Sequence, residues 1–294
     1  MRVRINNEMV ISLKKPNPKI LPVKSDIIFR LFFADERNVE ELINFLKSVL
    51  KLPDGDYNII EISDPHLLPE SDGDKLAIVD VKLRTKSGKV IHIEIQLKVT
   101  PEMKERIVYY DAKLITEQIG SGDKFSKIKK VISIIITEEN LINISPKYHH
   151  RFTFYDPDAM VELTDIMEIH TLELKKLPPA HDGTELYDWA KFIAASSEEE
   201  LSMIAERNPH VNKAIIKLRA LSADEKAREL YERREKARRD ADMFLRWELK
   251  KSKFDIARVM LENNESIEKI SMYTSLTQEE ITEAQNADWL NLNP

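Results

Sequence analysis

The sequence contains no cysteine, which excludes disulfide bonds and metal sites built from thiolates. It has no apolar run as long as a membrane-spanning helix needs, and its first twenty residues lack the apolar stretch of a signal peptide. Positive charge is not in excess, because the net charge is -6. Bulk electrostatics therefore does not indicate a nucleic-acid binder, although a local patch or a bound cation can still attract phosphate. These absences permit an intracellular setting, and we expect a cytoplasmic protein without a membrane partner.

The length of 294 residues suits one large domain and a smaller second part. A hydrophobic content of 42% is enough for an ordinary core. Strand-like patterns end near residue 177, and the chain beyond residue 183 has the character of helices. We therefore predict three parts, which are an N-terminal extension at 1–20, an α/β domain at 21–180 and a helical C-terminal region at 185–294.

The segment 76–99 alternates apolar and polar residues with a period of two, which predicts a hairpin of two half-buried strands. A three-residue loop at 86–88 brings apolar residues opposite apolar residues, and Gly88 supplies the left-handed conformation that such a loop requires. A loop one residue shorter would set polar residues against apolar ones along the whole face. The resulting register pairs Thr85 with Lys89, Asp80 with Glu94, and Ile78 with Gln96.

This register places two carboxylates, Asp80 and Glu94, directly opposite each other. Like charges in that position destabilise a sheet. A divalent cation between them would remove the penalty, and Mg²⁺ is commonly held by one or two carboxylates together with phosphate and water. The alternative is a solvated polar face with a tolerated mismatch, because structural charge clusters also occur.

Several further blocks accompany the carboxylate hairpin in a fixed order along the chain. They are LPVKSDIIFRLFF from Leu21, NVEELINFLKSVL from Asn38, DKLAIVDVKLRTKSGKVIHIEIQL from Asp74, ERIVYYDAKLITEQIGSGDKF from Glu105, KKVISIIIT from Lys129 and MEIHTLELKKL from Met167. Together they resemble the recombination-promoting nuclease (Rpn) family, the transposase-like branch of the PD-(D/E)XK nucleases. The resemblance implies an α/β fold with a central mixed sheet flanked by helices, followed here by an all-α region.

The resemblance also implies a metal-dependent DNA endonuclease linked to recombination or mobile elements. In that reading Asp80 and Glu94 bind Mg²⁺, or Mn²⁺ in its place, and the backbone carbonyl of Ile95 adds a ligand. Hydrolysis of a phosphodiester would be an in-line displacement that leaves a 3′-hydroxyl and a 5′-phosphate. The usual third catalytic residue is a lysine, but here it is Gln96, which can orient water and brings no charge. This departure implies either modest turnover, or that Lys98, Lys82 or a second metal supplies the missing positive charge.

Further carboxylates could assist this site from outside the hairpin. Asp26 begins a predicted helix, where it serves either as the N-cap or as an additional carboxylate near the metal. Glu40 and Glu41 lie in the first turn of the next predicted helix, where the helix dipole favours acids, although related nucleases place a metal-binding glutamate on an early helix. Asp72 and Asp74 precede the hairpin and could attract Mg²⁺, or be simply solvated.

Basic residues that could contact DNA occur in two places. Lys98 lies near the end of the predicted hairpin, and Arg106 lies on the predicted helix 102–119, where a guanidinium suits phosphate geometry. From residue 226 to 258 there are twelve Lys or Arg and seven Asp or Glu, a local charge of +5 in a predicted long helix. That helix either tracks a DNA backbone or forms a solvated face with internal ion pairs. Its candidate DNA contacts are Arg233, Arg234, Arg238 and Arg239.

The tail at 255–285 predicts helices separated by short breaks, with Thr277 and Glu280 forming a capping box. The tail is similar in size to a helix-turn-helix, but its last helix is acidic, which repels phosphate, so packing or a homodimer through the C-terminal helices is the favoured interpretation. A second hypothesis for the whole chain is a weakly active or inactive protein of nuclease fold that acts as a DNA-binding or assembly module. The intact set Asp80, Glu94 and Gln96 favours the enzyme.

Overall fold

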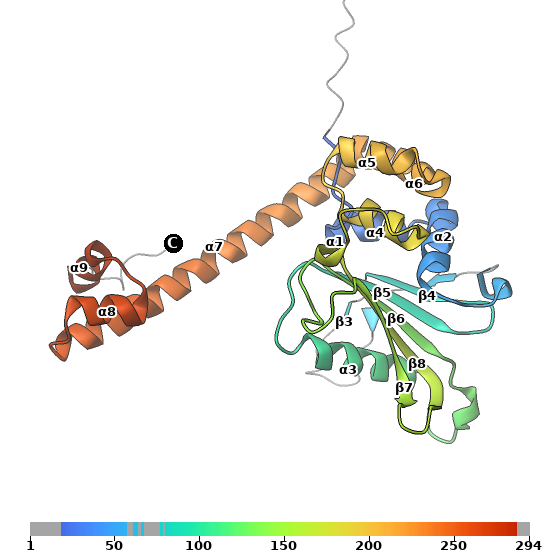
Figure 1. Ribbon diagram of the computed structural model, residues 1–294, viewed down its shortest axis with the longest axis horizontal. Coiled ribbons are helices and arrows are strands. Elements are labelled where there is room, and N and C mark those ends of the chain that lie inside the picture. Colours follow the sequence, from blue (N-terminus) through green and yellow to red (C-terminus); the bar gives the residue numbers. More distant parts are fainter. Residues whose placement is uncertain (1–18, 58–60, 64–65, 68–76, 79, 287–294) are drawn as a thin grey trace, which may run out of the picture. The chain divides into compact units, whose positions relative to one another are not determined.

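The computed structural model describes residues 19–57, 61–63, 66–67, 77–78 and 80–286. The chain forms two compact units, of which the first ends at Tyr231 and the second begins at Glu232. The first unit contains a six-stranded sheet with helices on both faces, and the second is helical (Figure 1). The predicted fold class, a central mixed sheet flanked by helices and followed by a helical region, is thereby confirmed.

The sheet is mixed because three parallel central strands are flanked by antiparallel neighbours. Strands β5, β6 and β8 pair in parallel, whereas β1, β4 and β7 pair antiparallel at the two sides. In sheet order the strands are β1 (Glu61–Ser63), β4 (Val81–Arg84), β5 (Val90–Gln96), β6 (Val131–Thr137), β8 (Val161–Glu173) and β7 (His149–Asp156). A parallel central strand is covered on both faces, so both faces of β5 and β6 lie in the interior.

The hairpin of β4 and β5 has the predicted loop and register. Gly88 has a φ of 86°, and its N–H donates to the carbonyl of Thr85 over 2.9 Å. Val81 pairs with Ile93 and Arg84 with Val90, the register that sets residue 80 opposite residue 94.

The first strand of the hairpin is shorter than the sequence predicted. Strand β4 begins at Val81, and Asp80 lies in a bend before it. The preceding strand β3 (Ala77–Ile78) pairs with β2 (His66–Leu67) in a separate two-stranded sheet. Ile78 therefore pairs with His66, and the prediction that it faces Gln96 is wrong. Alternation of polar and apolar residues cannot reveal such a break, because it continues unchanged across residue 80.

One face of the sheet carries the main core. Buried residues of β4, β5, β6 and β8 pack there against α1 (Asp26–Phe33), α2 (Val39–Val49) and α4 (Glu185–Ala194). Aromatic rings fill the space between the helices, with ring centroids 4.7 to 6.3 Å apart: Phe29, Phe32, Phe33, Phe45, Trp189 and Phe192. This packing holds the N-terminus of α1 close to the hairpin.

Helix α3 (Met103–Thr116) covers the opposite face of the sheet (Figure 1). Leu114 packs with Val90 and Val131, while Met103 and Ile107 pack with Ile135. The polar residues of β5 on this face are therefore buried under α3. The sequence predicted a half-buried strand, because its pattern does not show that a later helix returns to cover the polar side.

The far strands of the sheet are joined by an ionic network around Glu168 of β8. Its carboxylate accepts hydrogen bonds from Lys130 over 2.6 Å, Arg151 over 2.8 Å and His170 over 2.7 Å. Burial acts to raise the pKa of Glu168, but these three donors outweigh it and hold the pKa well below the usual range. The ionised carboxylate thus links β7 to β8 and to the start of β6.

The helices that follow the sheet belong to the first unit. Trp189 of α4, Ile204 of α5 (Glu198–Ala205) and Ile215 of α6 (Pro209–Ala223) are all part of the main core. The sequence boundary between 180 and 185 therefore marks a change from strands to helices, whereas the compact unit continues to Tyr231. Short 3-10 turns complete this unit at Glu36–Asn38, Asp54–Tyr57, Phe125–Lys127 and Leu174–Lys176.

The second unit is built from the later part of α7 (Glu225–Glu262) with α8 (Ile267–Thr274) and α9 (Gln278–Asn286). Its small core contains Phe254, Ala257, Ile270, Leu276, Ile281 and Ala284. The predicted capping box is present, since the Thr277 N–H donates to Glu280 and the Glu280 N–H donates to the Thr277 hydroxyl. In the part of the chain that the structure describes, no helix is both long enough and apolar enough to cross a membrane.

Candidate active site

The site lies where pairing between β4 and β5 stops. Asp80 precedes β4, and its Oδ2 accepts a hydrogen bond of 2.7 Å from the backbone N–H of Ile95. The side chain of Asp80 thus takes the place of a backbone partner on this edge of β5. The N–H and C=O of one strand residue point to the same side, so the Ile95 carbonyl faces the same edge of β5 as its N–H.

The surroundings of Asp80 disfavour its negative charge. Burial is the largest cause of a pKa raised to about 7, against an ordinary value of 3.8. The hydrogen bond from Ile95 lowers the pKa, the carboxylates of Glu94 and Asp26 raise it, and Arg30 lowers it to a smaller extent. The carboxylates of Glu94 and Asp26 are therefore close enough to repel that of Asp80, a repulsion that a cation would relieve.

Glu94 is held by two donors on one oxygen. It is only 4% exposed, and its Oε1 accepts hydrogen bonds of 2.8 Å from Gln96 Nε2 and of 2.8 Å from Arg106 Nη2. The guanidinium carbon of Arg106 also lies 5.4 Å from the ring centre of Tyr110, one turn along α3. Arg106, predicted as a phosphate contact, is thus the cation nearest to Glu94 in the described chain, while its side chain stays 41% exposed.

A buried polar cluster fixes α3 over this part of the sheet. His92 of β5 lies 2.6 Å from Asp111 of α3, and the Ser133 hydroxyl of β6 bonds to both. His92, Asp111 and Ser133 are all fully buried. His92 Nδ1 and Asp111 Oδ2 have no hydrogen-bond partner among the described residues. The cluster anchors the helix that carries Arg106, because it joins α3 to the same face of β5 as Glu94.

The predicted helix carboxylates occupy different places. Ser25 is the N-cap of α1, so Asp26 is the first helical residue and its charge acts on Asp80. Glu41 is buried and pairs with Lys217 of α6, and Glu40 lies 3.6 Å from Lys213 of the same helix. Asp26 therefore belongs to the surroundings of the site, whereas Glu40 and Glu41 point toward α6.

The predicted basic residues lie in two places, near the β4–β5 hairpin and on α7. Lys98 is exposed two residues beyond the end of β5, and Lys82 lies 3.7 Å from Glu117 of the segment after α3. The four arginines proposed to contact DNA are all exposed on α7 in the second unit, where Arg238 also pairs with Glu235 over 2.8 Å. They are Arg233, Arg234, Arg238 and Arg239.

The oxygen donors at the site fit a hard divalent cation. Asp80, Glu94 and the Ile95 carbonyl offer the ligand type that Mg²⁺ prefers, and Mg²⁺ usually keeps several waters beside one or two carboxylates. Within residues 19–57, 61–63, 66–67, 77–78 and 80–286, no three or more His, Cys, Asp or Glu gather as a metal-holding group. Asp72 and Asp74 lie outside the described residues. The donor set therefore suits a cation completed by water and phosphate.

Several residues of the site were not found by sequence reasoning. Arg30 follows Asp26 by four residues on α1, a helical spacing that could have indicated a charge pair near the site. Arg106 was predicted as a phosphate contact, but only the fold shows that it reaches Glu94. The hydrogen bond between His92 and Asp111 joins residues 19 positions apart, and no local sequence pattern predicts it.

A protein-family model matches most of the chain. The sequence model of a family described as PD-(D/E)XK nuclease family transposase matches residues 23–248. The match includes the hairpin, α3 and the whole sheet of the first unit. No curated protein and no solved structure matches the chain.

Proposed function

Since the chain belongs to the PD-(D/E)XK nuclease family transposases, we propose that it is a metal-dependent DNA endonuclease with Asp80 and Glu94 as its catalytic carboxylates. The family confirms the resemblance seen in the sequence and associates the chain with nuclease-like function and mobile elements. The observation that carries the proposal is the convergence of Asp80 and Glu94 at the end of the β4–β5 pairing. There the Asp80 carboxylate bonds to the Ile95 N–H over 2.7 Å.

In this proposal Asp80, Glu94 and the Ile95 carbonyl hold Mg²⁺ or Mn²⁺. When bound, such a cation polarises a scissile phosphate and lowers the pKa of a coordinated water. The chain's part is to keep the carboxylates in place before the cation arrives. The Ile95 N–H fixes Asp80, while Gln96 and Arg106 fix Glu94.

Gln96 and Arg106 together take the place of the lysine that PD-(D/E)XK nucleases usually carry. The Gln96 amide donates to Glu94, which leaves its carbonyl oxygen as an acceptor that can orient an attacking water. Arg106 supplies the positive charge that the amide lacks, and its partial exposure lets the guanidinium meet a phosphate. The two functions of the usual lysine are thus divided: Gln96 positions the attacking water, and Arg106 supplies the positive charge.

DNA contacts beyond the reacting phosphate would come from basic side chains. Lys98 is exposed just past the end of β5 and is the candidate on the first unit. The four arginines of α7, with a local charge of +5 between residues 226 and 258, are candidates on the second. Phosphate contacts of this kind are independent of sequence and weaken as salt rises. We expect the protein to act on DNA in the cytoplasm.

Nicking of a supercoiled plasmid tests the proposal. The purified wild type is compared with and without Mg²⁺ or Mn²⁺, and with EDTA. Glu94→Ala removes the central carboxylate, and Glu162→Ala is the matched control because Glu162 is an exposed glutamate on β8 of the same sheet. Both variants are first checked for equal helical content by circular dichroism.

Cleavage by the wild type and by Glu162→Ala in metal, with loss in EDTA and in Glu94→Ala, is the expected result. Equal cleavage by Glu94→Ala and the wild type would contradict the assignment of the site. A mobility shift of DNA without any cleavage would favour the alternative, a protein of nuclease fold that binds DNA or assembles on it.

A further inference from the structure

Helix α7 of the second unit carries a row of exposed apolar residues spaced alternately by four and three. Leu245, Leu249, Ile256 and Val259 are 64%, 60%, 50% and 56% exposed, and Ser252 completes the row between them. Spacing of this kind keeps five residues in line along one side of a helix and is the pattern of a coiled-coil seam. In heptad notation, 249 and 256 are a positions, and 245, 252 and 259 are d positions.

The seam lies away from the helices that pack on α7 inside its own unit. Phe254 and Leu261 occupy f positions, which lie opposite an a/d seam. Phe254 is part of the small core formed with α8 and α9, and Leu261 packs against it. Ala257, at a b position, is also in that core. Because α8 and α9 cover this other side, the seam at 245–259 stays exposed within the described part of the chain and is accessible to an external partner.

The charges beside the seam differ on its two sides. The g positions carry Glu248, Asp255 and Glu262, and the e positions carry Arg246 and Lys253. In a parallel pair of helices, each g residue meets the e residue five positions further along the partner, which sets Glu248 beside Lys253 of the second copy. In an antiparallel pair, g meets g and e meets e, which sets like charges together. Charges at e and g determine orientation, so this pattern favours a parallel pair.

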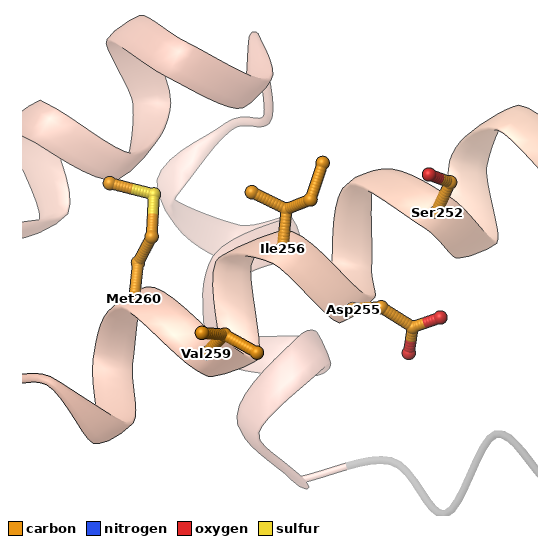
Figure 2. Close-up of a pocket in the computed structure, with 5 residues that line it drawn as sticks. All are labelled: Ser252, Asp255, Ile256, Val259 and Met260. Atoms are coloured by element: carbon orange, nitrogen blue, oxygen red, sulfur yellow. The ribbon is translucent and has the colours of Figure 1, made fainter.

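A hollow on the surface of α7 supports the same arrangement. Its lining residues Ser252, Asp255, Ile256 and Val259 occupy successive d, g, a and d positions, and Met260 completes its rim. Figure 2 shows that all five lining side chains project from this one helix. In a parallel coiled coil, four residues at d, g, a and d form the hole that receives an a-position side chain of the partner. The knob for this hole is Ile256 of the second copy.

We propose that the chain forms a homodimer in which α7 pairs with α7 of a second copy as a parallel, in-register coiled coil over residues 245–259. The paired segment is about 21 Å long at 1.5 Å per residue. It ends toward the N-terminus where Asp242 and Arg238 take the next a and d positions. The dimer would present two copies of the basic stretch of α7 side by side. This assembly does not depend on nuclease activity.

Sedimentation equilibrium of the full chain over a range of micromolar concentrations tests the proposal. The wild type is expected to be a dimer, and Ile256→Glu a monomer, because the substitution sets two charges into the hole. Phe244→Glu is the matched control, since Phe244 is 52% exposed on the same helix at a c position outside the seam. Circular dichroism establishes that both variants keep their helices.

A charge exchange tests the pairing without altering the seam. Glu248→Lys and Lys253→Glu, each alone, set like charges together and are expected to weaken dimerisation. The double variant restores opposite charges and is expected to dimerise as the wild type does. This arm remains informative even if Ile256→Glu fails to fold.

Orientation is tested by one introduced cysteine in this cysteine-free chain. Val259→Cys is expected to form a disulfide-linked dimer on oxidation, whereas Phe244→Cys is not. In an antiparallel pair centred on Ser252 the two residues at 259 would be about 21 Å apart, well beyond disulfide reach. A monomeric wild type, a dimer unaffected by Ile256→Glu, or a dimer without the Val259→Cys cross-link would each overturn the proposal.

Discussion

Replacing Asp80 with asparagine removes a charge that the fold disfavours and keeps the oxygen that accepts from Ile95. Burial, together with the nearby carboxylates of Glu94 and Asp26, raises the pKa of Asp80 to about 7. A carboxyl group with a raised pKa binds its proton more tightly in the folded state than in the unfolded chain. Its contribution to stability is therefore complete below the unfolded pKa and is lost as pH rises through about 7.

The expected magnitude follows from the size of the shift. A change from 3.8 to about 7 corresponds to about 4 kcal/mol between the two protonation states. Without metal, Asp80→Asn should therefore be more stable than the wild type above pH 7, by up to about 4 kcal/mol. Near pH 4 the two proteins should be nearly equal. Adding Mg²⁺ at pH 8 should stabilise the wild type and leave Asp80→Asn almost unchanged.

Urea unfolding in EDTA between pH 4 and pH 8.5 measures this difference, and repeating it with Mg²⁺ measures the effect of the cation. Asp158→Asn is a suitable control, because Asp158 is an exposed aspartate in the turn between β7 and β8. If the wild type were more stable than Asp80→Asn at pH 8 in EDTA, the carboxylate would not be under repulsion and the reasoning would fail.

Three further predictions concern packing and charge. Trp189→Ala should destabilise the first unit by about 3 to 5 kcal/mol in urea unfolding, and Phe125→Ala, at an 80% exposed position, should have little effect. Glu168→Gln should lose about 1 to 3 kcal/mol at pH 7. Because the pKa of Glu168 is lowered, this difference should shrink as pH falls below the ordinary glutamate value, and a constant difference would contradict the ionic network. Arg106→Ala should destabilise the metal-free protein by about 1 to 3 kcal/mol, because Glu94 loses its charged donor. Added Mg²⁺ should recover part of that loss, and an unchanged unfolding midpoint would refute the pairing.

The sequence was sufficient for the loop of the hairpin and for the register of β4 with β5. The alternation of apolar residues left one loop length that kept both faces matched, and Gly88 with its φ of 86° is the residue that loop needs. Because register fixes which residues stand opposite, the approach of Asp80 to Glu94 could be predicted without the fold. Burial is the main cause of the raised pKa of Asp80, and the smaller contribution of the Glu94 charge agrees with that prediction.

Other features depend on contacts between distant parts of the chain. No local pattern in the sequence shows that α3 packs over β5 and buries His92. Nor does any pattern show that Asp111 of α3 forms a hydrogen bond with His92. Glu41 pairs with Lys217, which is 176 positions away. The position of Glu41 in the first turn of a helix therefore could not predict this ion pair. Binary patterning predicts which side of an element is apolar, and the tertiary fold alone decides what covers the polar side.

The most direct test of Glu94 as a catalytic carboxylate is the initial rate of plasmid nicking in Mg²⁺ by Glu94→Gln relative to Glu162→Gln. Glutamine keeps the size of Glu94 and an acceptor for its two donors, and it removes the charge that would hold the cation. We expect a rate at least about 100-fold lower for Glu94→Gln, equivalent to about 3 kcal/mol of transition-state stabilisation. Equal rates for the two variants would contradict the assignment of Glu94 to the active site.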